Sequence, residues 1–158
     1  MRDPFQTLSN LPQQTGLRLV LLLTSLPMPL SVKEKRDIEI EIGFLEPLVN
    51  KAPDFVEALQ LLADDYTKVG RTLDGLRLDE MLAELCPDDA LVHYNLACSH
   101  SLTGRLSEAA KNLLRAFELG YRDFQWLAKD QDLESLRNAP EFQIVAQKMA
   151  ELQNHPYS

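Results

Sequence analysis

The chain of 158 residues overlays on itself when it is shifted by 34 residues. The coincident positions include the prolines and glycines that punctuate helices, as well as the leucines and alanines that fill cores. They are Pro53 with Pro87, Asp54 with Asp88, Leu62 with Leu96, Ala63 with Ala97, Gly70 with Gly104, Arg71 with Arg105, and Leu85 with Leu119. A repeat of this period is one supersecondary unit that buries its apolar face only against its neighbours. The sequence therefore predicts stacked repeats.

Each repeat is predicted to hold two helices and no strand. Glycine is scarce, with 6 residues, and apolar residues recur at three- and four-residue spacing, which favours an all-α protein. In the second repeat, Asp88 or Asp89 can cap the first helix. Gly104 can end that helix because glycine adopts the left-handed conformation at little cost. The four helices are expected at 54–69, 73–85, 90–102 and 107–119.

This pattern resembles the tetratricopeptide repeat (TPR) family, which combines leucine and a small residue with a tyrosine, a mid-repeat glycine and a final proline. The first repeat supplies Leu59, Leu62, Ala63, Tyr66, Gly70, Leu82 and Pro87, and the second supplies Leu96, Ala97, His100, Gly104, Ala109, Leu113 and Ala116. Gly75 and Asp79 stand where alanine and a large apolar residue are usual, so we expect helix 73–85 to pack loosely. The resemblance implies an α-solenoid of antiparallel helix pairs, in which the first helix of each repeat lines a concave groove.

The chain upstream of the repeats divides into two parts. Residues 32–53 carry apolar residues at helical spacing and are interpreted as a degenerate helical cap. Pro47 lies inside this helix and is expected to kink or split it near Gly43, since proline removes a backbone donor. Residues 1–31 are expected to be disordered or loosely docked, which places the TPR-like domain at 32–158.

The full repeats, at about 54–87 and 88–121, cannot bury both ends of their stack by themselves. Residues 122–155 resemble the segment that closes many bacterial TPR arrays, and we interpret them as the second helical cap. The side chains predicted to cover the open end of the last repeat are Trp126, Leu127, Leu133, Leu136 and Phe142.

Charge and composition exclude several classes of protein. The net charge is −8, from 16 basic and 24 acidic residues without a basic stripe, so nucleic-acid binding lacks its main electrostatic term. Residues 16–30 are apolar but too short, and too broken by Pro27 and Pro29, to span a membrane. A signal peptide is the alternative interpretation of this stretch. Cys86 and Cys98 form no disulfide framework, and we expect reduced thiols in the cytoplasm.

Catalysis and metal binding each lack a recognisable arrangement. Cys98 and His100 are two residues apart on a predicted helix, so their side chains point away from each other. Cys86, His93, Cys98 and His100 match no zinc-site spacing. We therefore predict no enzyme activity, no metal site and no cofactor.

Binding of another protein is the remaining class, with an extended or helical segment of the partner lying in the groove. The groove residues are predicted to be Gln60, Asp64, Thr67, Lys68, Leu91, Tyr94, Asn95, Cys98 and Ser101. Tyr94 is the largest amphipathic side chain among them and is expected to contribute most to binding. Asp64 would repel a carboxylate, so the clamp that chaperone-binding TPR domains use for acidic tails is not expected. Asn95 matches one position of that clamp, and a purely structural role is an equal alternative.

A second hypothesis remains open beside the peptide-binding module. In it, the chain is a structural subunit that assembles through its convex or end surfaces, with its own N-terminal segment in the groove. The sequence does not decide the oligomeric state, the partner or the pathway.

Overall fold

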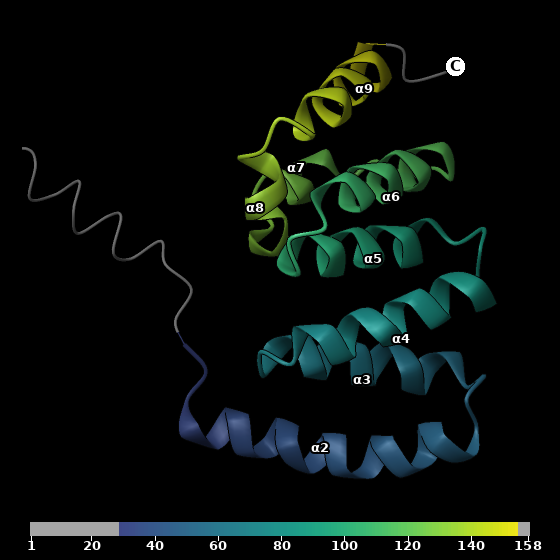
Figure 1. Ribbon diagram of the computed structural model, residues 1–158, viewed down its shortest axis with the longest axis vertical. Coiled ribbons are helices and arrows are strands. Elements are labelled where there is room, and N and C mark those ends of the chain that lie inside the picture. The colour runs from purple at the N-terminus through teal and green to yellow at the C-terminus, as the bar shows by residue number, and fades with distance from the viewer. Residues whose placement is uncertain (1–28, 155–158) are drawn as a thin grey trace, which may run out of the picture. The chain divides into compact units, whose positions relative to one another are not determined.

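The computed structural model of the protein describes residues 29–154, and every regular element in that range is a helix (Figure 1). The all-α prediction is confirmed, with no strand between residues 29 and 154. Most of the predicted N-terminal segment, residues 1–28, lies outside the described residues. The elements are α2 Val32–Lys51, α3 Val56–Lys68, α4 Thr72–Leu85, α5 Ala90–Leu102, α6 Leu106–Glu118, α7 Phe124–Leu127, η1 Gln131–Leu133, α8 Glu134–Arg137 and α9 Phe142–Asn154.

The turn that separates the two helices of a repeat is the same in both repeats. Gly70 and Gly104 both have positive φ, at +83° and +75°. The backbone N–H of Arg71 bonds to the carbonyl of Tyr66 at 2.7 Å, and that of Arg105 bonds to the carbonyl of His100 at 2.8 Å. Such a six-to-one bond across a left-handed residue satisfies the last free carbonyls of a helix. The predicted conformation of Gly104 is confirmed.

Helix starts agree with the sequence less closely than helix ends do. The carboxylate of Asp89 accepts the backbone N–H groups of Leu91 and Val92, so Asp89 rather than Asp88 caps α5. Helix α3 begins at Val56, two residues later than predicted. The residue before it, Phe55, makes no side-chain capping bond. Within the described region, α3 packs on α4, α4 on α5, and α5 on α6.

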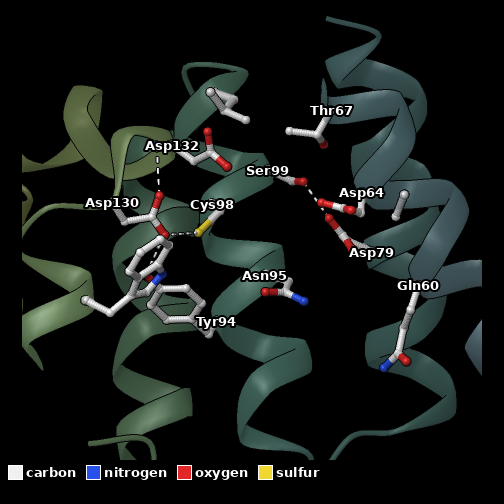
Figure 2. Close-up of a pocket in the computed structure, with 13 residues that line it drawn as sticks. Gln60, Asp64, Thr67, Asp79, Tyr94, Asn95, Cys98, Ser99, Asp130 and Asp132 are labelled. Carbon is white, nitrogen blue, oxygen red and sulfur yellow. Dashed lines mark hydrogen bonds between the residues drawn. The ribbon is translucent and has the colours of Figure 1, made fainter. Parts of the chain in front are cut away.

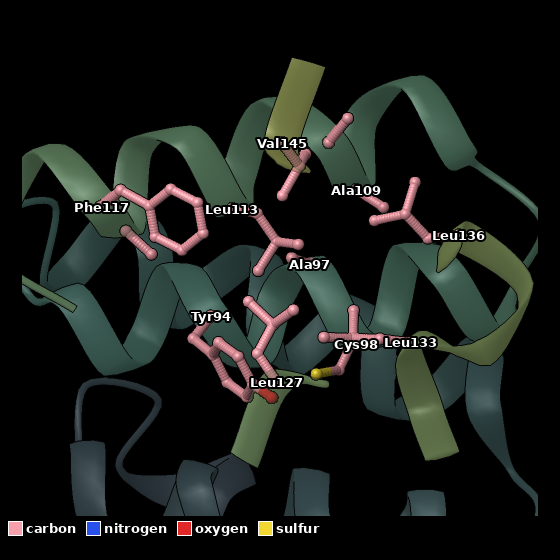
Figure 3. Close-up of a cluster of buried hydrophobic side chains, with 12 residues drawn as sticks. Tyr94, Ala97, Cys98, Ala109, Leu113, Phe117, Leu127, Leu133, Leu136 and Val145 are labelled. Atoms are coloured by element: carbon pink, nitrogen blue, oxygen red, sulfur yellow. The ribbon is translucent and has the colours of Figure 1, made fainter. Parts of the chain in front are cut away.

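Two apolar clusters form the core. One joins α2, α3 and α4 with Val92 of α5, and its member Leu59 has no exposed surface. The other joins α5 and α6 to the closing segment, where Leu113 and Phe117 meet buried residues of α7, η1, α8 and α9 (Figure 3). Its members are Tyr94, Ala97, Cys98, Ala109, Ala110, Leu113, Ala116, Phe117, Leu127, Leu133, Leu136 and Val145.

The closing segment covers α5 and α6 with a partly different set of residues from the one predicted. Leu127, Leu133 and Leu136 are fully buried, as expected, and Val145 on α9 joins them. Trp126 was expected in the cover, but it is 49% exposed. In the four-residue helix α7, Leu127 takes the inward position and leaves its neighbour Trp126 on the outside.

Helix α2 runs without interruption through Gly43 and Pro47, so the predicted split is wrong. Proline removes one backbone donor, and the carbonyl that loses its partner belongs to the residue four positions earlier, Gly43. Both residues are exposed, so water can reach that carbonyl. Ile42 and Val49 on the opposite face are buried and hold the helix in place.

Helix α4 does not pack loosely, contrary to expectation. A Cβ atom placed on Gly75 would lie 2.9 Å from Oγ1 of Thr67 and 3.2 Å from the carbonyl oxygen of Ala63. The absence of a side chain at Gly75 therefore allows α3 and α4 to approach closely. Asp79 is also buried, and its carboxylate accepts a hydrogen bond from Ser99 at 2.5 Å.

Candidate binding site

A cavity of about 240 Å³ lies between α3, α4, α5 and the segment that joins α7 to η1 (Figure 2). Helical spacing brings the lining residues of each helix onto one face. On α3 the lining residues are three and four positions apart. On α5 they form two adjacent rows, in each of which neighbours are four positions apart. The lining residues are Gln60, Ala63, Asp64, Thr67, Asp79, Tyr94, Asn95, Cys98, Ser99, Leu102, Trp126, Asp130 and Asp132.

Six of the nine residues predicted for the groove line this cavity: Gln60, Asp64, Thr67, Tyr94, Asn95 and Cys98. The other three lie elsewhere. Lys68 is at the surface, where its ammonium group pairs with the carboxylate of Asp64. Leu91 is 55% exposed outside the cavity. Ser101 is buried, and its hydroxyl accepts the backbone N–H of Leu136 at 3.4 Å.

Tyr94 is a core residue, so the exposed position expected for its ring is wrong, while its contribution to partner binding stays a prediction. Its side chain is only 3% exposed, and its ring stacks on that of Tyr121 with centroids 4.4 Å apart. Its hydroxyl donates to Oδ2 of Asp130 at 2.6 Å. Burial raises the pKa of Tyr94, with the bond to Asp130 adding to it, so the hydroxyl stays a donor. The closing segment buries this ring, and the pattern of the repeats does not predict that burial.

Asp130 organises the wall opposite α3. Its Oδ2 accepts from Tyr94 and lies 3.8 Å from the sulfur of Cys98, while its Oδ1 accepts the backbone N–H of Asp132 at 3.1 Å. The guanidinium of Arg137 donates to the backbone carbonyls of Leu127 and Asp130. These bonds fix the short segment between α7 and η1 on α5.

Cys98 is not poised for nucleophilic chemistry. Burial raises its pKa well above the ordinary value, and the nearby carboxylate of Asp130 raises it further. A thiolate is the reactive form of cysteine, and this site disfavours it. His100 lies apart: it is buried, burial lowers its pKa, and its Nδ1 has no partner within residues 29–154.

The other residues considered for a metal site do not converge. The ring of His93 contacts Oδ1 of Asn112 at 3.1 Å and the carbonyl of Pro87 at 2.9 Å. In the region that the structure describes, no three histidine, cysteine or acidic side chains group as metal ligands would.

Four aspartates give the cavity a negative electrostatic character. Burial raises the pKa of Asp79 to about 6, and the charge of Asp64 adds to this effect while the bond from Ser99 opposes it. Burial also raises the pKa of Asp132, and the negative charges of Asp130 and Asp64 raise it further. The four aspartates come from α3, α4, the α7–η1 segment and η1, and no lysine or arginine is among the lining residues.

Trp126 forms the accessible aromatic part of the cavity wall. It is half exposed, and the ammonium group of Lys129 lies 5.5 Å from its ring centroid. The exposure of this side chain leaves aromatic surface available beside the carboxylates.

Sequence reasoning missed seven lining residues: Ala63, Asp79, Ser99, Leu102, Trp126, Asp130 and Asp132. Asp79 did carry a signal, because a carboxylate in a slot that normally holds a large apolar residue needs a polar neighbour. Asp130 and Asp132 carried none. They reach the cavity only because the closing segment returns to α5.

No family model matches the chain. The chain is similar to a chloroplastic protein of Arabidopsis thaliana, with 30% identity over 122 residues. The match covers 73% of this chain and 35% of the plant protein. The chain thus spans about a third of the length of that relative. Between residues 29 and 154, no helix has both the length and the apolar character needed to cross a membrane.

Proposed function

We propose that the chain is a non-enzymatic protein-interaction module that binds an extended or helical segment of a partner protein. The observation that carries the proposal is the cavity between α3, α4, α5 and the α7–η1 segment. It is bounded by side chains of α3 and α5, the two helices that were predicted to line the groove. Its exposed polar residues, such as Asn95, can bond to a peptide backbone.

The proposed architecture is an α-solenoid of TPR type with full repeats at about 54–87 and 88–121. The equivalent turns at Gly70 and Gly104, 34 residues apart, support it. So does the packing of each helix on the next along the chain from α3 to α6. The caps of this array are α2 and the closing segment from α7 to α9.

The chemistry of the cavity also supports a binding role. Its hydroxyl and thiol groups at Tyr94 and Cys98 are buried, and both have pKa values raised by that burial. Both groups donate to the carboxylate of Asp130, and their raised pKa values keep them protonated, so neither is present as the anion that acts as a nucleophile.

The second candidate function is a structural subunit that assembles through an exposed surface. The observation that favours it lies on α2, where Ile40, Phe44 and Leu48 are exposed at four-residue spacing. Residues at this spacing share one face of a helix. A concentration-dependent mass in sedimentation equilibrium that Phe44→Ser abolishes would place this function first.

The test of the binding function uses a display library of short random peptides selected on the full chain. Affinities of the selected peptides are then measured by fluorescence anisotropy for Gln60→Trp and for Gln143→Trp. Gln60 lines the cavity, whereas Gln143 is exposed on α9 outside it. We expect Gln60→Trp to weaken binding by at least about tenfold because a large ring fills the site, and Gln143→Trp to leave it unchanged. Equal affinities for both variants, or no selected peptide, would refute the proposal.

A further inference from the structure

We propose that the cavity receives a cationic side chain of the bound segment, with arginine preferred over lysine. This inference rests on the proposed binding function and adds the chemistry by which the partner is recognised.

The first observation is a buried carboxylate that faces the cavity with unused bonding capacity. Asp79 is 6% exposed, and only its Oδ2 has a protein donor, the hydroxyl of Ser99 (Figure 2). Its other oxygen receives no hydrogen bond from residues 29–154, although the side chain lines the cavity. This second oxygen keeps accessible surface, since it is not among the buried unpartnered atoms of the described residues, and the side chain lines the cavity. A donor from a ligand would complete its bonding.

The second observation is the excess of negative charge among the residues that line the cavity with that oxygen. Asp64, Asp130 and Asp132 line the same cavity, and no basic side chain is among its lining residues. Lys68 pairs with Asp64 from the surface, and the ammonium group of Lys129 lies over the ring of Trp126. Burial and mutual repulsion raise the pKa values of Asp79 and Asp132. A cation in this space relieves the repulsion, whereas a carboxylate would add to it.

The third observation selects arginine. Trp126 is half exposed on the wall of the cavity, and its ring already holds one cation, the ammonium group of Lys129 5.5 Å from the ring centroid. A guanidinium group is planar, stacks on aromatic faces and donates up to five hydrogen bonds in a fixed geometry. It can therefore bond to carboxylates while it lies against the ring. An ammonium group is a strongly hydrated point charge and gains less from the same wall.

The test uses five pools of short peptides that are random except at one central position. That position holds arginine, citrulline, lysine, norleucine or glutamate. Citrulline has the shape of arginine without its charge. Each pool is titrated against the full chain by fluorescence anisotropy, and each titration is repeated with Gln60→Trp to show that the cavity is the site.

We expect the arginine pool to bind about tenfold more tightly than the citrulline pool, and the lysine pool to fall between them. Asp132→Asn should reduce the arginine preference several-fold. Asp37→Asn, which changes an exposed aspartate on α2 outside the cavity, should not change it. Both variants lose one negative charge, so a difference between them is local to the cavity.

The outcomes separate this inference from the binding function on which it rests. If all pools bind equally and Gln60→Trp still abolishes binding, the cavity binds peptides but does not select a cation, and the inference is wrong. If the glutamate pool binds best, the inference is also wrong. If no pool binds to the chain, the proposed function itself fails.

Discussion

The hydroxyl of Tyr94 on α5 donates a hydrogen bond to Oδ2 of Asp130, 2.6 Å away and 36 residues later in the chain. This bond joins the second predicted repeat to the closing segment. Both residues also line the cavity, so the contact that docks the closing segment also shapes the candidate site. Stability and binding are therefore linked at this point of the fold.

Tyr94→Phe removes the donor and leaves the buried carboxylate of Asp130 without its strongest partner. Leaving a buried acceptor unsatisfied costs about 1–3 kcal/mol, and more for a charged group. We expect a loss of this size in the free energy of unfolding, measured by urea denaturation. Tyr94→Ala also removes a buried ring that stacks on Tyr121, and should cost about 3–5 kcal/mol.

Tyr66→Phe is the matched control for this bond. The hydroxyl of Tyr66 donates to Oε1 of Glu46 at 2.7 Å, but the Glu46 side chain is 40% exposed, so water can replace the lost donor. This change should cost less than about 1 kcal/mol. Equal losses for Tyr66→Phe and Tyr94→Phe would show that the bond to Asp130 has no special weight.

Gly75→Ala should destabilise the protein, although alanine is the better helix former by about 1 kcal/mol. The new Cβ would lie 3.2 Å from the carbonyl oxygen of Ala63, and backbone cannot yield as a flexible side chain can. Overpacking of this kind costs about 1–3 kcal/mol. The melting temperature of Gly75→Ala is therefore expected to fall below that of the wild type.

Gly43→Ala supplies the opposite result from the same substitution. Gly43 lies within α2, and a Cβ added there meets nothing within 4 Å. Only the propensity gain remains, so the melting temperature should rise with a stabilisation of about 0.5–1 kcal/mol. A stabilising effect at both positions would mean that α3 and α4 are not held at the close distance described.

The fold was predictable where the chain carries local signals. Gly104 and the cap at Asp89 act through the conformation and bonding of single residues. The sequence located the first and restricted the second to Asp88 or Asp89. The split predicted at Pro47 was wrong because the effect of a proline depends on whether water can reach the carbonyl that loses its partner, and sequence periodicity does not reveal this exposure. The loose packing predicted at Gly75 was wrong because the sequence does not show that a neighbouring helix fills the space left by the missing side chain.

The candidate site was predictable on α3 and α5 but not on its third wall. Gln60 and Asn95 follow from helical spacing within the repeats. Asp130 reaches the cavity through long-range contacts that no local pattern encodes, and those contacts bury the ring of Tyr94. The exposed position predicted for the ring of Tyr94 is therefore wrong for the same reason that Asp130 was missed.

Asp79→Asn should stabilise the protein at neutral pH. The pKa of Asp79 is raised from its ordinary 3.8 to about 6, mainly by burial, so ionisation is less favourable in the folded state than in the unfolded one. A difference of this size corresponds to about 3 kcal/mol as an upper limit. Asparagine keeps an acceptor for the Ser99 hydroxyl and has no charge to bury.

The direction of the pH dependence follows from the raised pKa of Asp79. Between about pH 4 and pH 6 the folded state holds the proton of Asp79 more tightly than the unfolded state. The contribution of Asp79 is therefore fully present below about pH 4 and is lost as the pH rises through about 6. The stability difference between Asp79→Asn and the wild type, from urea denaturation, should grow over this range. A difference that shrinks with rising pH would contradict the assignment.

Leu133→Ala should destabilise the protein by about 2–5 kcal/mol, because Leu133 is fully buried between the closing segment and the second repeat. Removal of residues 124–158 should have a larger effect, since it uncovers Leu113 and Phe117 together, and we expect partial melting or aggregation. Ile144→Ala, at a residue 57% exposed on α9, is the control and should change stability little. An unchanged melting temperature of the truncated chain would show that the closing segment is not a cap.

Asp64→Lys should weaken the binding of peptides from the arginine pool and strengthen that of the glutamate pool, because it reverses one of the four charges that line the cavity. The effect on stability should be small, since the ion pair with Lys68 is exposed and such pairs contribute about 0.3–0.5 kcal/mol. The change in affinity should be larger at low ionic strength, where charges near the surface are screened less. Asp54→Lys makes the same change of charge at an exposed position before α3, outside the cavity. If both variants shift peptide affinity equally at each salt concentration, net charge rather than the cavity determines the preference.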